Sequence, residues 1–173
     1  MEAIERGCAG PEALVLAKSI IKRATEAGIT VCTAESCTGG LVCGALTDIA
    51  GSSAAVLGGV CSYAVPVKEA VLGVPTEITQ DESVGVVSAE CAEAMATGVR
   101  KLLGSDIAVS TTGIAGPGGE EPGKPVGTVW FAVDSRRGTS SVRQVFDGDR
   151  MAVREQATAF ALGLVLDEIE ALA

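Results

Sequence analysis

A run of β-branched residues, a turn of small residues and an apolar helical pattern follow one another near residue 36. Ile29–Thr33 is typical of a buried strand, residues 33–40 read TAESCTGG, and Leu41–Ile49 is typical of a helix. A strand that turns directly into a helix favours an α/β fold and presents the free N–H groups of the helix N-terminus at the turn. Ser36 therefore lies where a hydroxyl nucleophile or a bound anion would face those groups.

Helical and strand patterns alternate along the rest of the chain, and the capping residues mark their ends. Helices are predicted at 11–28, 66–73, 88–103 and 149–172, and strands at 56–63, 106–114, 126–133 and 140–146. The last two strands form a hairpin around Asp134–Thr139, whereas 74–87 and 118–125 read as loops. The pattern predicts an α/β class fold, a three-layer α/β/α sandwich on a mixed, mostly parallel sheet with a C-terminal β-hairpin.

Length and composition indicate one domain with an aliphatic core. The 173 residues fit a single domain over 1–173, with 47% hydrophobic but only 3% aromatic residues. Mean hydropathy is +0.39, yet no apolar run reaches the roughly 18 residues that span a bilayer. The charged N-terminal segment Met1–Arg6 lacks the apolar stretch of a secretion signal. We therefore expect a cytoplasmic protein without a membrane partner.

Charge and cysteine usage exclude several kinds of site. A formal charge of −9 without clustered Lys or Arg disfavours nucleic acid as a partner. The six cysteines form no C-x-x-C pair, and the chain has no histidine, so neither a disulfide framework nor a metal site is predicted. Cys32, Cys61 and Cys91 read as buried small hydrophobes. Cys37 stays open as an alternative nucleophile, because a helix start favours a thiolate.

Without histidine, a base for Ser36 must be a lysine or a carboxylate. Of the five lysines, two lie on the expected solvated face of the first helix, and Lys101 lies in the last turn of another. Lys68 and Lys124 remain. Lys68 has apolar neighbours that would lower the pKa of its ammonium, although a short surface helix equally accommodates an ordinary lysine.

Two further segments are candidates for the same site. Thr112 ends a predicted strand, and the carboxyl ends of strands line the ligand crevice of open α/β sheets. Arg150 begins the last helix, where a cation is unfavourable to the helix dipole unless it binds an anion. Arg154, one turn later, would share the helix face of Arg150. Thr112 could equally be an ordinary strand residue, and Arg150 could belong to a solvated helix face with Glu155 nearby.

Four segments together resemble the CinA C-terminal domain family, whose characterised enzymes are nicotinamide-nucleotide amidases. They are AESCTGG at 34–40, TDIAGSS at 47–53, TGIAGPGG at 112–119 and GKPVG at 123–127. The resemblance extends from about Leu14 to Leu166. It implies hydrolysis of nicotinamide mononucleotide (NMN) to nicotinate mononucleotide and ammonia, by a serine amidohydrolase that needs no cofactor. The larger CinA proteins add an N-terminal molybdopterin-binding-like domain, for which this chain is too short.

The resemblance also implies roles for individual residues. The nucleophile falls on Ser36 and the lysine base on Lys68, with Tyr63 as a relay and Thr112 orienting the pair. The substrate-binding residues it implies are Thr38, Gly39 and Gly40 for the oxyanion, Gly113 and Gly116 in the glycine loop, and Arg150.

The family's Tyr-Ser-Asn-x-x-Lys segment reads YAVPVK at 63–68, so its serine and asparagine are replaced. We also expect the protein to form a homodimer. Two functions remain as alternatives to the amidase. One is a catalytically silent nucleotide-binding domain, and the other is an accessory protein of DNA uptake or damage response.

Overall fold

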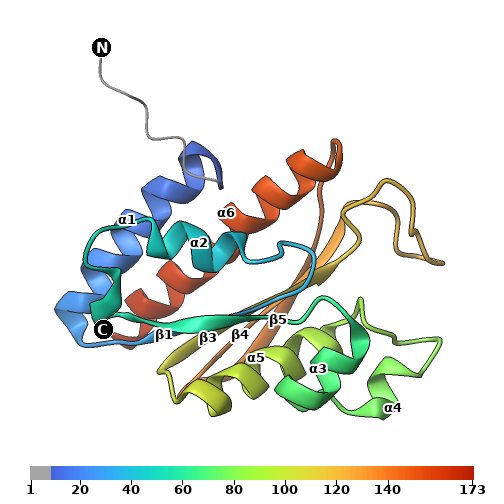
Figure 1. Cartoon of the computed structure of the whole chain (residues 1–173), viewed down its shortest axis with the longest axis horizontal. Helices are drawn as coiled ribbons and strands as arrows, with labels where there is room; N and C mark the ends of the chain where they lie inside the picture. The colour runs from blue at the N-terminus through green and yellow to red at the C-terminus, as the bar shows by residue number, and fades with distance from the viewer. Residues whose placement is uncertain (1–8) are drawn as a thin grey trace.

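The computed structural model describes residues 9–173 and places helices on both faces of one sheet (Figure 1). The predicted α/β class and mixed sheet are confirmed. Cys8 and the segment Met1–Arg6 lie outside the described residues. The helices are α1 (Gly10–Ala27), α2 (Leu41–Thr47), the 3₁₀ turn η1 (Ser52–Ala54), α3 (Val65–Leu72), α4 (Thr76–Thr79), α5 (Ala89–Leu103) and α6 (Arg150–Leu172). The strands are β1 (Val31–Glu35), β2 (Val56–Cys61), β3 (Ile107–Gly113), β4 (Thr128–Ser135) and β5 (Gly138–Val145).

The sheet has the strand order β2-β1-β3-β4-β5, which brings three parallel strand ends together. β1 pairs in parallel with β2 and β3, whereas β4 is antiparallel to β3 and β5. Four strands therefore share one direction and β4 opposes them. Glu35, the last residue of β1, pairs with Cys61 of β2 and Thr111 of β3. The carboxyl ends of β1, β2 and β3 thus form one edge of the sheet.

Small residues bring the helices close to the sheet. α1, α2 and α6 cover one face, and α3, α4 and α5 cover the other (Figure 1). α1 buries Ala13, Ala17 and Ala24 beside Ile20, and Gly28 ends it in the left-handed conformation. The expected aliphatic, alanine-rich core is confirmed. Within residues 9–173, no helix has the combined length and apolarity to cross a bilayer.

Several element boundaries differ from the sequence-based expectation. β1 begins at Val31, not Ile29, because the Ile29 N–H donates to Ala24 O at 2.9 Å and so completes the end of α1. The expected loop at 74–87 contains the short helix α4. β4 and β5 both reach further toward their turn than predicted, with Ser135 paired to Gly138, so the hairpin turn is only two residues long.

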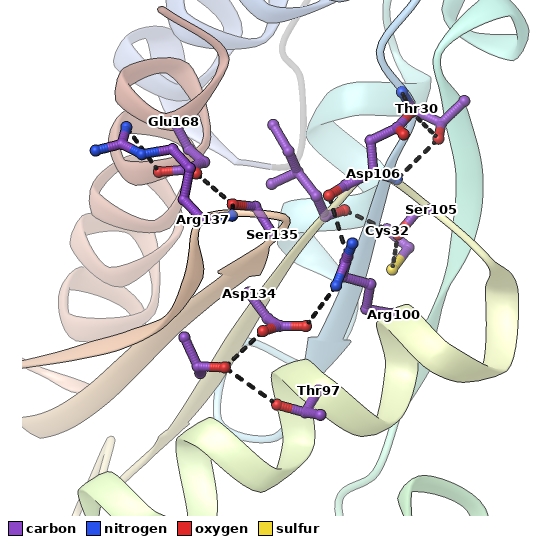
Figure 2. Close-up of polar contacts among 12 residues, drawn as sticks. Thr30, Cys32, Thr97, Arg100, Ser105, Asp106, Asp134, Ser135, Arg137 and Glu168 are labelled. Atoms are coloured by element: carbon purple, nitrogen blue, oxygen red, sulfur yellow. Dashed lines mark hydrogen bonds and ion pairs between the residues drawn. The ribbon is translucent and has the colours of Figure 1, made fainter. Parts of the chain in front are cut away.

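A polar network fixes the other end of the sheet (Figure 2). Arg100 of α5 contacts the Asp134 carboxylate at 3.3 Å and donates to Asp106 O at 3.1 Å. The Asp106 carboxylate in turn accepts from the N–H of Thr30 at 2.8 Å and from its hydroxyl at 2.7 Å. A cavity of about 600 Å³ at this end is lined by Arg100 and Asp106. It lies at the opposite edge of the sheet from Ser36 and contains no candidate nucleophile.

Candidate active site

Ser36 is the first residue after β1, at the edge where the parallel strands end. Its N–H donates to Thr111 O of β3 at 2.9 Å, which extends the β1–β3 ladder by one residue and fixes the serine backbone. The side chain is 9% exposed. The serine hydroxyl is therefore held by the sheet and almost shielded from solvent.

Lys68 reaches Ser36 from α3, which begins at Val65 with Pro66 in its first turn. Its Nζ donates to Ser36 Oγ at 2.9 Å, to Ser62 O at 2.5 Å and to Tyr63 O at 3.3 Å. The side chain is 1% exposed, and this burial lowers the pKa of its ammonium from the ordinary value of 10.5. In the neutral amine, the two carbonyls can take both N–H groups, and the lone pair then faces the serine hydroxyl.

The carboxylate of Glu35 organises the turn that carries Ser36. It is 1% exposed and accepts hydrogen bonds from the N–H groups of Gly40, Val42 and Cys43 at 2.8–3.1 Å. It also accepts from the hydroxyls of two nearby threonines, Thr33 at 3.1 Å and Thr38 at 2.7 Å. Glu35 thus caps α2 from the preceding strand, a role the sequence analysis missed. The missing cap was a signal, because Gly40 at the N-cap position has no side chain to supply one.

This cap corrects the expected oxyanion donors. The N–H of Gly40 donates to Glu35 at 2.9 Å, and that of Gly39 donates to Ser36 O at 3.1 Å. The Thr38 hydroxyl is buried between Glu35 and Thr111. Around the turn, the N–H groups of Cys37 and Thr38 have no oxygen acceptor among the described residues. Both N–H groups instead contact the Cys37 thiol, and they are the candidates that remain for binding an oxyanion beside Ser36.

A second arginine of α6 braces the same turn. Arg154 donates from Nε to Cys37 O at 3.1 Å and from Nη2 to Thr38 O at 2.8 Å. The sequence placed Arg154 on a helix face shared with Arg150. The structure instead uses its guanidinium to hold the carbonyls of the turn.

The cysteines are free thiols in residues 9–173. Cys37 is buried, and this desolvation raises the pKa of its thiol to about 11, so it stays protonated at neutral pH. Burial therefore disfavours the thiolate on which the Cys37 alternative depends. Cys32 and Cys91 are buried as predicted, whereas Cys61, at the end of the edge strand β2, is exposed.

A cavity of about 190 Å³ surrounds the Ser36–Lys68 pair. Its lining contains the remaining predicted residues Tyr63, Thr112, Gly113 and Arg150, together with Cys37, Val65, Val86, Val87 and Ala115. A side chain at Gly113 would place its Cβ 2.5 Å from Thr128 O, so the close approach of β4 requires glycine there. The predicted residues therefore gather around one cavity, apart from Thr38, Gly39, Gly40 and Gly116.

The contacts of Tyr63 and Thr112 differ from their expected roles. Tyr63 is 65% exposed, and its hydroxyl accepts from Arg150 Nη2 at 3.2 Å, whereas Lys68 contacts Ser36 directly. The structure therefore does not place the Tyr63 phenol between Ser36 and Lys68, where it could relay a proton. The Thr112 hydroxyl donates to Val86 O at 2.6 Å, so it holds the cavity wall and not the Ser36–Lys68 pair.

Arg150 lies at the mouth of this cavity and borders a second one. Its Nη1 donates to Gly116 O at 2.8 Å, so the carbonyl of Gly116, not its N–H, faces the guanidinium. The second cavity, of about 570 Å³, shares Ala115 and Arg150 with the first and is also lined by Gly116, Pro117, Val126 and Met151. An exposed cation thus stands between two adjoining cavities.

Comparison with known proteins shows the family to which the chain belongs. The model of the CinA C-terminal domain matches residues 13–169. The chain belongs to the CinA C-terminal domain family. It is similar to a CinA-like protein of Geobacter sulfurreducens, 48% identical over 137 residues that cover 79% of this chain and 33% of that protein. A CinA-like protein of Mycobacterium sp. (strain MCS) is 51% identical over 142 residues, again 33% of its length. The chain thus spans about a third of these curated relatives.

Solved structures of the CinA superfamily share the fold over nearly the whole chain. The competence/damage inducible protein CihA of Agrobacterium tumefaciens is 40% identical, with a TM-score of 0.85 over 93% of this chain and 97% of that one. A CinA superfamily protein of Klebsiella pneumoniae is 36% identical, with a TM-score of 0.86 over 92% and 98%. The CinA domain described here therefore has the same architecture as these proteins.

Proposed function

We propose that this CinA domain hydrolyses the carboxamide of NMN to nicotinate mononucleotide and ammonia. The observation that carries the proposal is the 2.9 Å contact between Lys68 Nζ and Ser36 Oγ in a buried cavity without histidine. Burial lowers the pKa of the Lys68 ammonium, which favours the neutral amine that a base requires. The two carbonyls that hold Nζ orient its lone pair toward the serine.

Catalysis proceeds through an acyl-enzyme. Ser36 Oγ attacks the amide carbon while Lys68 takes its proton, and the tetrahedral oxyanion accepts from the N–H groups of Cys37 and Thr38. One such donor contributes about 3 kcal/mol to lowering the barrier. The tetrahedral intermediate collapses as the Lys68 ammonium protonates the amide nitrogen, so the C–N bond breaks and the nitrogen leaves as ammonia. Lys68 then deprotonates a water that attacks the ester, which releases the carboxylate and restores the serine hydroxyl.

Cavity shape and charge support a nucleotide amide as substrate. The inner cavity of about 190 Å³ combines polar groups with the apolar side chains of Val65, Val87 and Ala115, which suit a flat nicotinamide ring. The adjoining cavity of about 570 Å³ has room for the ribose phosphate, and the Arg150 guanidinium can pair with the phosphate. The N-terminus of α2 cannot bind that phosphate, because the Glu35 carboxylate already occupies it.

An ammonia-release assay on NMN tests the proposal, with free nicotinamide and glutamine as control amides. We expect ammonia from NMN, little from the controls, and none from Ser36→Ala, which should still fold and bind NMN. A domain that binds NMN without releasing ammonia would be the silent nucleotide-binding alternative. Ser36→Ala with substantial remaining activity would contradict the assignment of the nucleophile.

A further inference from the structure

One wall of the candidate active site is an irregular segment between two helices. We call Val84–Val87, between α4 and α5, the wall segment. Val86 and Val87 line the cavity that contains Ser36 and Lys68. No helix or strand includes these residues. The position of this wall therefore depends on contacts other than a regular backbone ladder.

Three side chains from different parts of the chain hold three consecutive carbonyls of the wall segment. Val84 O accepts from Lys124 Nζ at 2.8 Å, and Gly85 O accepts from the hydroxyl of Ser88, the N-cap of α5, at 2.8 Å. Val86 O accepts from the Thr112 hydroxyl of β3 at 2.6 Å. Polar groups of an irregular segment need such partners, and here each partner also fixes the segment in space.

Lys124 is the donor whose role the catalytic cycle does not explain. It lies in the GKPVG segment and was the second lysine that the sequence left as a candidate base. Its side chain is 16% exposed, and its Nζ is held between Val84 O and the Glu121 carboxylate at 2.9 Å. The backbones of Glu121 and Lys124 also pair, through two hydrogen bonds of 2.8 and 3.0 Å. The ammonium is thus presented to the wall segment from a closed loop.

We propose that Lys124 is a positioning residue, whose hydrogen bond to Val84 O fixes the wall segment beside the Ser36–Lys68 pair and keeps water out of the cavity. The effect on catalysis rests on the proposed amidase function, whereas the fixing of the wall segment does not depend on it. Both parts of the Lys124 side chain contribute to this role. The methylene stem shields the contact with Val84 O from water, and the charge of the ammonium strengthens that hydrogen bond.

Water in the cavity would act first on Lys68. Burial is the main cause of the lowered pKa of the Lys68 ammonium. If the wall segment opens, hydration stabilises the charged form and raises this pKa back toward 10.5. The neutral amine is then less populated at neutral pH, so Ser36 reacts more slowly there and regains its rate only at higher pH.

Three variants and one matched control test the inference. Lys124→Met removes the donor, Lys124→Arg keeps one, and Glu121→Gln removes the ion pair but leaves the bond to Val84. Lys101→Met removes an exposed lysine at the end of α5. The first readout is hydrogen exchange of the amides of Val84–Val87. The second is the pH dependence of Ser36 labelling by a fluorophosphonate, in which Oγ bonds to phosphorus and fluoride leaves.

In Lys124→Met, we expect the rate of amide hydrogen exchange in the wall segment to rise about tenfold or more. The pH at which Ser36 labelling reaches half its maximum rate should move to a higher value. Lys124→Arg should recover most of both properties, while Glu121→Gln and Lys101→Met should resemble the parent. Lys124→Gln repeats the test if Lys124→Met does not fold. Unchanged exchange and an unchanged midpoint in Lys124→Met would overturn the inference, as would equal opening in Glu121→Gln or Lys101→Met.

The structural readout separates this inference from the proposed function. A parent protein that releases no ammonia from NMN, but whose Lys124→Met variant shows faster exchange, would refute the amidase proposal and support the positioning role. A parent that is active on NMN, with a Lys124→Met variant unchanged in exchange and pH dependence, would support the amidase and refute the positioning role.

Discussion

Replacing Glu35 by glutamine tests how strongly the active-site turn depends on its buried carboxylate. Oε2 accepts three hydrogen bonds, from the Thr38 hydroxyl and the N–H groups of Gly40 and Val42. Oε1 accepts two, from the Thr33 hydroxyl and the Cys43 N–H. The less costly amide orientation therefore puts NH₂ in the place of Oε1, where it meets the Cys43 N–H as a second donor.

The expected loss of stability follows from those contacts. Leaving one backbone donor without an acceptor costs about 1–3 kcal/mol. The loss of negative charge at the N-terminus of α2 adds about 0.3–1 kcal/mol. We therefore expect Glu35→Gln to lower the free energy of unfolding by about 1–4 kcal/mol. At roughly 2–4 °C per kcal/mol for a domain of this size, Tm should fall by about 3–16 °C.

Urea unfolding followed by circular dichroism measures this difference, with thermal unfolding as a second reading. Glu155→Gln is the matched control, because Glu155 is exposed on α6, and it should change stability by less than about 0.5 kcal/mol. If Glu35→Gln is no more destabilising than Glu155→Gln, the Glu35 carboxylate does not organise the turn that carries Ser36. Labelling of Ser36 should also slow in Glu35→Gln, because the turn loses its anchor.

Lys68→Arg should lose as much NMN turnover as Lys68→Ala in the ammonia assay, because guanidinium keeps its proton at working pH. The stability of the parent relative to Lys68→Met should rise with pH up to about 10.5, since between the lowered folded pKa and 10.5 the unfolded chain binds more protons. Urea unfolding at pH 7 and 9.5 measures this. Cys37→Ala should keep most of its turnover, because burial raises the pKa of that thiol to about 11. Arg150→Ala should raise KM for NMN about tenfold with a smaller change in kcat, consistent with loss of one charge-assisted bond.

Specific results would contradict each of these expectations. Substantial activity in Lys68→Arg would reduce the lysine to an electrostatic contact, and a flat stability difference from pH 7 to 9.5 would mean that its pKa is unshifted. Loss of activity in a folded Cys37→Ala would return the thiol to the mechanism. Arg150→Ala equally impaired on NMN and on nicotinamide riboside, which lacks the phosphate, would indicate that Arg150 supports the fold.

The sequence predicted the elements that carry the site better than the contacts within it. The strand-turn-helix pattern around Ser36 and the helix carrying Lys68 depend on local periodicity and capping, and the structure contains both. Glu35 was missed because a glutamate at a strand end looks like any solvated carboxylate until α2 is packed over it. The outward direction of the Tyr63 phenol was equally beyond reach, since it depends on Arg150, 87 residues away.

The brace supplied by Arg154 has a consequence for the order in which the protein becomes competent. The guanidinium of α6 holds the carbonyls of the Ser36 turn across 116 and 117 residues of chain. During synthesis, Ser36 emerges early but this support emerges only with the final helix. Closing so long a loop is entropically costly, so the turn gains the Arg154 contacts only when the rest of the sheet has assembled. Chains that stop before α6 would therefore contain Ser36 without the contacts that hold its turn.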